Sequence, residues 1–350
     1  MLESENDKSK WQGLSEDSSV GSMYQSFWWA DPLKRHGVRA KGIGMWKENR
    51  LVGGGLFRSI PIPFVGSHLT QCLAGPLHLD WEPRWADEFV SQVAQLARDD
   101  NSMEVAIHRC PSREMHRDII DAFLRRGLKI TFASSAAEAV LSLKDSTPED
   151  IWKGMIKGTR ENIRKAQKNA IQIRELTSSD ELRSAHTAWM ATAKRKNFTD
   201  IRPWASLEPV LRYCVDNDIG KVYASFKDDK MLAAIFIVFI GGQALYVYGG
   251  FMDGSEKHSP NHILHFEAIK HCFERRIETY NFGDLTWNYE VERGGTDQFK
   301  FGFGARPKQN LDSIIWKRKP LLAGCCAWLQ RNQVGKKLVA ELRRHMAERG

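Results

Sequence analysis

Apolar residues recur along the chain with two different spacings, and these predict the secondary structure. Runs in which apolar positions alternate or follow one another predict strands at 39–46, 51–60, 68–74, 103–108, 139–143, 221–226, 231–240, 244–248 and 278–282. Apolar residues three or four positions apart predict helices at 23–34, 85–97, 113–126, 152–168, 181–195, 203–216 and 262–276. Such a succession of strands and helices indicates an α/β protein of the α+β type, with mixed sheets flanked by helices.

One part of this pattern occurs twice, about 180 residues apart. Residues 46–55 read W-K-E-N-R-L-V-G-G-G, and residues 226–235 read F-K-D-D-K-M-L-A-A-I. Each copy predicts a strand, a charged tight turn and a second strand, and each is followed by an amphipathic helix and a further strand. Solenoid repeats are only 20–50 residues long, so this repeat indicates a duplicated domain. We expect the functional site in a cleft between the two lobes.

The sequence also suggests where each lobe begins and ends. Residues 146–150 read S-T-P-E-D, which is typical of a helix start, with a capping hydroxyl, a proline in the first turn and acids at the positive end. We therefore expect a first lobe over residues 21–150 and a second over residues 151–310. Residues 1–20 are predicted to form a disordered lead-in, and residues 311–350 a basic helical tail that packs on the first lobe.

Composition narrows the class of protein. Hydrophobic residues make up 42% and charged residues 27% of the chain, as in ordinary soluble domains. Apolar runs stay shorter than the roughly 18 residues of a membrane span, and the N-terminus lacks a signal-peptide pattern. The six cysteines form no C-x-x-C pair, so we expect reduced thiols in a cytoplasmic protein. The adjacent Cys325 and Cys326 are interpreted as buried packing residues.

The net charge of +8 is unevenly distributed. Residues 152–168 carry six basic side chains and a single acid, Glu161, and the segment after Trp316 is also strongly basic. This charge suits a polyanionic partner such as nucleic acid or an anionic membrane surface. The simpler alternative is a solvated helix face.

Four motifs, in order along the chain, resemble those of the Fem family of aminoacyl-tRNA-dependent transferases. They are Q-S-F-W-W-A-D-P-L-K at 25–34, A-G-P-L-H-L-D at 74–80, G-T-R-E-N-I-R-K-A-Q-K-N-A at 158–170, and T-Y-N-F-G-D at 279–284 followed by D-Q-F-K-F-G-F-G at 297–304. The resemblance covers roughly residues 20–310. It implies two tandem acetyltransferase-like (GNAT) lobes, each a mixed twisted sheet flanked by helices, with the basic helical tail following them.

The resemblance also implies a reaction. The family transfers an amino acid from its ester on tRNA to an amine, usually on a peptidoglycan precursor peptide and in some relatives on another small acceptor. It needs aminoacyl-tRNA as co-substrate and no metal or bound cofactor. In this family pattern Lys300 stabilises the tetrahedral intermediate, and Phe299 packs beside it. An amine attacking an ester does pass through an oxyanion, and a positioned donor there contributes about 10²–10³ in rate.

The resemblance assigns binding roles to further residues. Acceptor contacts are implied for Lys34, Asp80, Arg202 and Tyr248. We expect tRNA contacts from Lys157, Arg164 and Lys168, peripheral contact with anionic membrane, and a monomer. The chain departs from the family pattern at Ser206, where a tyrosine is common, and at Asn281, where the family has aspartate. The missing tyrosine puts the standard muropeptide acceptor in doubt.

Several alternatives remain open from the sequence. Lys300 in F-K-F-G-F is also the pattern of a surface lysine on a strand of alternating aromatics. A GNAT-type N-acyltransferase using acyl-CoA or acyl carrier protein is the second function, although G-S-E-K-H-S-P-N before His262 lacks a glycine-rich phosphate cradle. The third is a degenerate binding protein without turnover. The histidines at 262, 265 and 271 share one predicted helix and are interpreted as a polar helix face rather than a metal site.

Overall fold

The computed structural model describes residues 2, 4–17, 19–62, 65–196, 201–286 and 295–331. Its contacts divide the chain into two compact units. The first unit comprises Met1–Ser15, Tyr24–Ser135 and Leu311–Gly350, and the second comprises Glu16–Met23 and Ala136–Asn310. No helix among the described residues is both long enough and apolar enough to cross a membrane.

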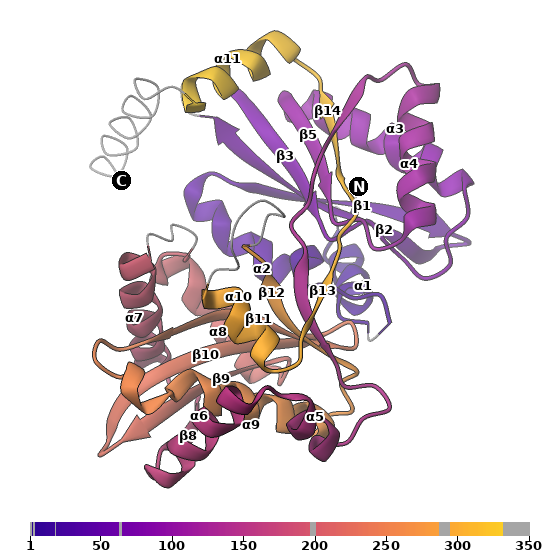
Figure 1. The fold of residues 1–350 in the computed structure, drawn as a ribbon. Helices are drawn as coiled ribbons and strands as arrows, with labels where there is room; N and C mark the ends of the chain where they lie inside the picture. The colour runs from indigo at the N-terminus through magenta and orange to yellow at the C-terminus, as the bar shows by residue number, and fades with distance from the viewer. Residues whose placement is uncertain are drawn as a thin grey trace. The chain divides into compact units, whose positions relative to one another are not determined.

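The first unit is a mixed sheet with strand order β1-β2-β3-β5-β14-β6, and β4 pairs with β2 (Figure 1). The strands are β1 (Arg39–Lys47), β2 (Arg50–Ile62), β3 (Ser67–Leu73), β4 (Leu77–His78), β5 (Ser102–His108), β6 (Ile130–Ala133) and β14 (Ser313–Lys317). The helices are α1 (Glu5–Ser15), α2 (Phe27–Ala30), η2 (Asp31–His36), α3 (Arg84–Asp99), α4 (Arg113–Arg125) and α11 (Pro320–Arg331), and η1 (Met23–Gln25) begins at the unit boundary.

The second unit is a mixed sheet with strand order β13-β7-β12-β11-β10-β9-β8. Its strands are β7 (Glu138–Ser142), β8 (Gln172–Leu176), β9 (Gly220–Lys227), β10 (Lys230–Ile240), β11 (Gln243–Phe251), β12 (Thr279–Asp284) and β13 (Arg306–Lys308). Its helices are α5 (Pro148–Gly154), α6 (Lys157–Lys168), α7 (Ser179–Lys196), α8 (Trp204–Asp216), η3 (Glu256–His258), α9 (Pro260–Glu274) and α10 (Gly295–Gly302). Helices α6 and α9 lie on one face of the sheet, and α7 and α8 on the other (Figure 1).

The two units share one folding pattern, which confirms the predicted duplication. In each, a hairpin turns through two left-handed residues, Glu48 and Asn49 in the first unit and Asp228 and Asp229 in the second. Asn49, Asp228 and Asp229 have short polar side chains that tolerate this backbone, and the turn matches the twist of the strands. A third antiparallel strand follows, and a helix then crosses over to a parallel strand: β3 to β5 through α3, and β11 to β12 through α9.

Two strands join sheets in a way that differs from the unit boundaries expected from the sequence. Strand β7 lies before the expected boundary at residue 150, yet it pairs with β12 in the second sheet, with Ser142 opposite Thr279. Strand β14 lies in the expected tail, yet it pairs with β5 and β6 in the first sheet. Backbone pairing therefore divides the chain after Ser135 and before Leu311. Residues 332–350 of the expected tail lie outside the described residues.

The prediction of a disordered lead-in is wrong for the described part of residues 1–20. Helix α1 occupies Glu5–Ser15, and Trp11 and Leu14 are buried. The Trp11 indole N–H donates to the carbonyl of Gln25 at 2.6 Å. The polar composition concealed these two apolar residues, which lie three positions apart and so share one helix face.

Two further predictions from the sequence were wrong, and one was confirmed. The basic helix expected at 152–168 is two helices, because α5 ends at Gly154 and Met155 is extended before α6 begins. The helix start at 146–150 is confirmed, since Thr147 forms a capping box with Asp150. Cys325 is exposed on α11, not buried.

Trp11 allows a direct test of the N-terminal helix. Trp11→Ala should lower the free energy of unfolding of the first unit by about 3–5 kcal/mol, because it removes a fully buried aromatic side chain. Urea unfolding followed by circular dichroism measures this. Ser9→Ala, an exposed change on the same helix, is the control and should have little effect. A loss well under 1 kcal/mol for Trp11→Ala would contradict the packing of α1.

Candidate functional site

Lys300 is a buried cation in the second unit. It lies in α10, its side chain is only 6% exposed, and its amine donates a hydrogen bond to the backbone carbonyl of Asp284 at the end of β12. The alternative of a surface lysine on a strand is therefore wrong. A lysine so deeply buried is rare unless paired or functional.

The surroundings of Lys300 act on its charge in opposite directions. Burial lowers its pKa, whereas the carboxylates of Asp297, Asp284 and Glu138 raise it, and the net effect is a pKa below the ordinary value of 10.5. Asp297 is itself fully buried and accepts hydrogen bonds from the Thr286 backbone N–H at 3.2 Å and from its hydroxyl at 2.9 Å. Asp297 precedes Lys300 by one helical turn in the D-Q-F-K motif, but its burial follows only from the tertiary structure.

An aromatic cluster lies beside Lys300. The Phe299 ring centroid is 4.9 Å from that of His262 and 5.3 Å from those of His265 and Phe303. His265 Nδ1 is 2.7 Å from the Tyr280 hydroxyl oxygen. Burial lowers the pKa of His262 to about 4 and that of His265 to about 3, so both rings are neutral near pH 7. The prediction of a polar histidine face is wrong for these two residues, which pack against aromatic rings.

The sheet opens next to this cluster. The parallel strands β11 and β12 pair from Gln243 opposite Thr279 to Leu245 opposite Asn281. Beyond Leu245, β11 continues beside β10, and beyond Asn281, β12 continues beside β7. The two strands therefore separate toward the end of β12, where the Asp284 carbonyl accepts the hydrogen bond from Lys300. Backbone groups released by such a separation can bind the backbone of an extended ligand.

Two expected acceptor contacts also belong to the second unit. Arg202 is mostly buried, and its backbone carbonyl is 2.9 Å from His186 Nε2. Tyr248, on β11, packs against Trp189 with ring centroids 5.6 Å apart. Ser206, where a tyrosine is common in the family, is fully buried in the first turn of α8, and its hydroxyl donates to the Pro203 carbonyl at 3.2 Å.

The other two expected acceptor contacts, Lys34 and Asp80, lie in the first unit. Lys34 is exposed in η2 and forms an ion pair with Asp31 at 3.0 Å. Asp80 is exposed just after β4, and its backbone N–H donates to His78 Nδ1 at 2.9 Å. The convergence of these residues with Arg202 and Tyr248 on one cleft stays a prediction, because the two units are described separately.

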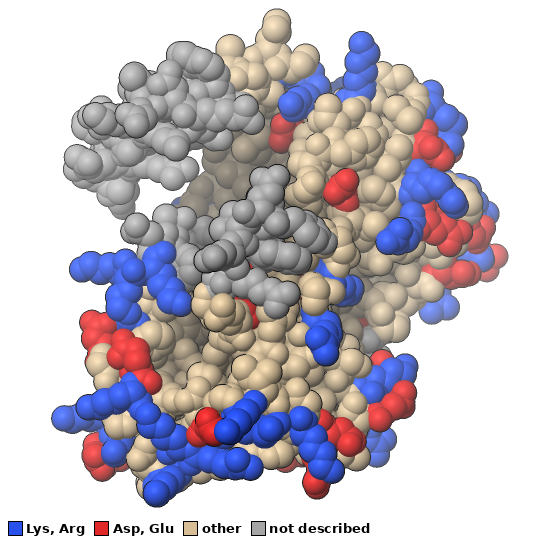
Figure 2. All heavy atoms as spheres, in the orientation of Figure 1, with Lys and Arg blue, Asp and Glu red and all other residues tan. Residues whose placement is uncertain are grey.

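The basic helix α6 begins beside the helix that carries Lys300. The Ile156 backbone N–H, at the N-cap of α6, donates to the Gly302 carbonyl at the end of α10 at 3.0 Å. Lys157, Arg164 and Lys168 are exposed on α6; Lys157 is 3.8 Å from Glu161, and Arg164 lies over the Trp152 ring at 5.3 Å. Figure 2 shows Lys and Arg side chains gathered along the part of the second unit where Figure 1 places α5 and α6.

Comparisons with known proteins agree with this architecture. The family model described as acetyltransferase (GNAT) domain matches residues 156–300. The crystal structure of FemX is similar with a TM-score of 0.77 at 13% identity, covering 91% of this chain and 98% of FemX. The C-terminal domain assigned to a lysylphosphatidylglycerol synthetase of Agrobacterium fabrum gives 0.58 at 14% identity, covering 89% and 92% of the two chains. L-PGS from Bacillus licheniformis gives a TM-score of 0.54 at 12% identity, covering 94% of this chain and 98% of L-PGS.

These likenesses bear on fold and enzyme class. The prediction of a Fem-like tandem GNAT fold is confirmed by the match along nearly the whole chain. The prediction of an acyltransferase is supported at the level of the GNAT domain. A comparison with curated proteins found no match.

The electrostatic environment of Lys300 predicts its titration. We expect its amine to lose its proton below pH 10.5, because burial outweighs the nearby carboxylates. Between this lowered pKa and 10.5 the unfolded chain binds the extra proton, so the contribution of Lys300 to stability rises with pH. Heteronuclear NMR of the lysine side chains, assigned with Lys300→Arg, measures the pKa. A measured pKa for Lys300 at or above the ordinary lysine value of 10.5 would contradict this account.

Proposed function

We propose that this chain transfers an aminoacyl group from aminoacyl-tRNA to an amine acceptor and forms a peptide bond. The acceptor class is an amine on a peptidoglycan precursor peptide or a related small molecule. The single observation that carries the proposal is the buried ammonium of Lys300 at the point where β11 and β12 separate. The fold shared with FemX supports the same reading.

The position of Lys300 suits stabilisation of an oxyanion. An ammonium has three N–H donors, so while one bonds to the Asp284 carbonyl another can donate to a developing negative oxygen. The amine is buried beside an aromatic cluster, and burial strengthens such an interaction relative to water. The helix and the hydrogen bond fix the amine beforehand, so little reorganisation is needed as the charge develops.

The reaction proceeds in two steps around that oxygen. The neutral acceptor amine attacks the ester carbonyl carbon, a C–N bond forms, and the carbonyl oxygen becomes an oxyanion that Lys300 stabilises. The intermediate then collapses, the C–O bond to the terminal ribose breaks, and the proton lost by the amine passes to the ribose oxygen. The products are an amide and free tRNA, and atoms and charge balance without a metal or redox cofactor.

The basic helix α6 supports tRNA as the donor. Its N-cap is hydrogen-bonded to the end of α10, the helix that carries Lys300. A ligand that binds α6 through its phosphates can therefore extend one end toward Lys300. Lys and Arg side chains bind phosphates mainly through charge, which does not depend on base sequence.

Acyl transfer from acyl-CoA or an acyl carrier protein is the second candidate, favoured by the match to an acetyltransferase (GNAT) domain at residues 156–300. The entry to α9 is a poor phosphate cradle, because Ser259 is left-handed and Pro260 occupies the first turn without an N–H. Thermal stabilisation by CoA, with none by tRNA, would favour this candidate.

Lys300→Ala should lower turnover by at least about two orders of magnitude while leaving the acceptor KM nearly unchanged. An oxyanion donor acts in the transition state rather than on the bound ground state. Steady-state kinetics with charged tRNA measures both quantities. Lys308→Ala removes an exposed lysine from β13 and should retain wild-type rates. Wild-type turnover in Lys300→Ala would exclude the assigned role and favour a binding protein or another catalytic residue.

Replacing Lys157, Arg164 and Lys168 by Gln should weaken tRNA binding and flatten its salt dependence. Each phosphate contact contributes roughly 0.7–0.9 log units of affinity per log unit of salt. Reaction with a short acceptor-stem mimic should change little. The affinity for tRNA is measured by filter binding across a salt series.

The matched control for the charge itself is a triple Gln variant of Arg113, Arg117 and Lys129, which are exposed in the first unit. It should keep the wild-type slope. Identical slopes for the α6 variant and wild type would remove α6 from the tRNA site. Loss of liposome binding with tRNA affinity intact would instead identify α6 as a membrane contact.

A further inference from the structure

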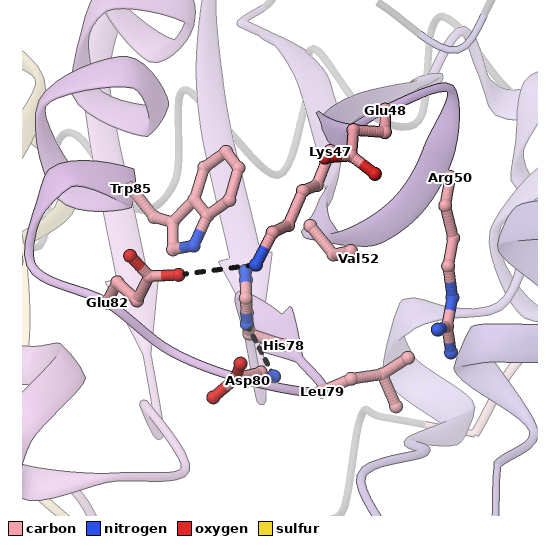
Figure 3. Close-up of a pocket in the computed structure, with 9 residues that line it drawn as sticks. All are labelled: Lys47, Glu48, Arg50, Val52, His78, Leu79, Asp80, Glu82 and Trp85. Atoms are coloured by element: carbon pink, nitrogen blue, oxygen red, sulfur yellow. Dashed lines mark hydrogen bonds and ion pairs between the residues drawn. The ribbon is translucent and has the colours of Figure 1, made fainter.

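The first unit contains a cavity of about 470 Å³, and Asp80 is the one residue of its lining that is also an expected acceptor contact. It lies between the β1–β2 turn, the end of β4 and the first turn of α3 (Figure 3). The residues that bear on its chemistry are Lys47, Arg50, His78, Asp80, Glu82 and Trp85. All belong to one unit, so the cavity is complete within it.

Two buried N–H donors at this cavity lack acceptors. His78 is 6% exposed and Trp85 is 5% exposed. Among the residues that the structure describes, neither His78 Nε2 nor Trp85 Nε1 has a hydrogen-bond partner. A buried donor without an acceptor is costly, and such groups in folded proteins are usually satisfied by a ligand or water.

The protonation of His78 follows from its neighbours. Its Nδ1 accepts a hydrogen bond from the Asp80 backbone N–H at 2.9 Å, which assigns the ring proton to Nε2. Burial lowers the pKa of His78 to about 4, so the ring is neutral at pH 7. His78 Nε2–H and Trp85 Nε1–H are therefore two neutral donors, and both require an acceptor atom.

Packing holds the two rings in place. The centroids of His78 and Trp85 are 5.5 Å apart, and Trp81 packs edge-on against His78 at 5.4 Å. A Cβ at Gly53 would lie 2.3 Å from His78 Cδ2, so only glycine admits the ring there. Trp81 provides a contrast, because its indole N–H donates to Asp118 at 2.9 Å and is satisfied.

The charges around the donors are mixed. Lys47 and Arg50 are cations, and Glu48, Asp80 and Glu82 are carboxylates. Lys47 approaches Glu82 to 3.8 Å, and Figure 3 shows both side chains pointing toward the ring nitrogens of His78 and Trp85. A multiply charged phosphate would meet three carboxylates here. A ligand with one carboxylate and one ammonium group matches both sets of charges.

We propose that this cavity binds a free α-amino acid. The ligand carboxylate accepts hydrogen bonds from His78 Nε2–H and Trp85 Nε1–H beside the Lys47 amine. The ligand ammonium lies among the carboxylates of Asp80 and Glu82. The inference concerns the first unit alone and does not depend on aminoacyl transfer, because binding is measured without tRNA.

The test is a titration of the full-length, ¹⁵N-tryptophan-labelled protein with glycine, L-alanine and L-lysine. The chain has 12 tryptophans, and the Trp85 indole signal is identified by its loss in Trp85→Phe. We expect this signal to move downfield saturably with at least one amino acid. Acetate and methylammonium, which each carry half of the charge pattern, should bind more weakly.

Trp85→Phe keeps an aromatic ring but removes the unpartnered N–H together with the five-membered ring of the indole. It should weaken amino-acid binding, followed by calorimetry, at least about tenfold, since a bond to a charged acceptor is lost. Without ligand its melting temperature should fall, because a smaller ring leaves a cavity in the core, so the affinity and not the melting temperature tests the role of the N–H. Trp81→Phe is the control: it breaks the bond to Asp118, so it should lower the melting temperature and leave affinity nearly unchanged.

Three results would overturn the proposal. The first is the absence of a saturable shift with every amino acid, which would mean that water alone occupies the cavity. The second is equal affinity in Trp85→Phe and wild type. The third is tighter binding of inorganic phosphate than of amino acids, which would assign the donors to a different anion. None of these results bears on transfer by Lys300.

Discussion

The buried ammonium of Lys300 is the constraint on which the second unit's site depends. A lysine charge in an aromatic core is unfavourable, and the chain compensates with the Asp284 carbonyl and the carboxylate of Asp297. Asp297 is in turn held by Thr286. A buried charge that is retained by nearby groups of opposite charge is typical of functional sites. The short helix α10 holds the lysine so that its amine reaches the end of β12.

Duplication of one fold has produced two units with different chemistry. In the second unit, β11 and β12 separate after three paired residues and the lysine lies at the separation. In the first unit, β3 and β5 stay paired from His68 to Leu73, so the equivalent opening is absent from the pairing of these strands. Its chemistry lies instead at the cavity formed by His78 and Trp85. The two units therefore share a frame, and each proposed site lies where its unit departs from that frame.

Local patterns predicted most of this fold, and long-range pairing accounts for what they missed. The hairpin turns at Asn49 and Asp229 and the cap at Thr147 follow from nearby residues, and the structure has all three. Strands β7 and β14 join sheets across their expected boundaries, which depends on partners far away in sequence. The same holds for the sites. Motifs identified Lys300, but the burial of His265 and the unpartnered donors of His78 and Trp85 depend on tertiary packing.

The most direct test of the central claim is the product formed from a mixed pool of aminoacyl-tRNAs and candidate amines, identified by mass spectrometry. We expect an amide whose mass is that of one amine plus one aminoacyl residue, and its formation should stop when RNase destroys the tRNA beforehand. A product that forms only with acyl-CoA, or whose yield is unaffected by RNase, would contradict aminoacyl transfer from tRNA.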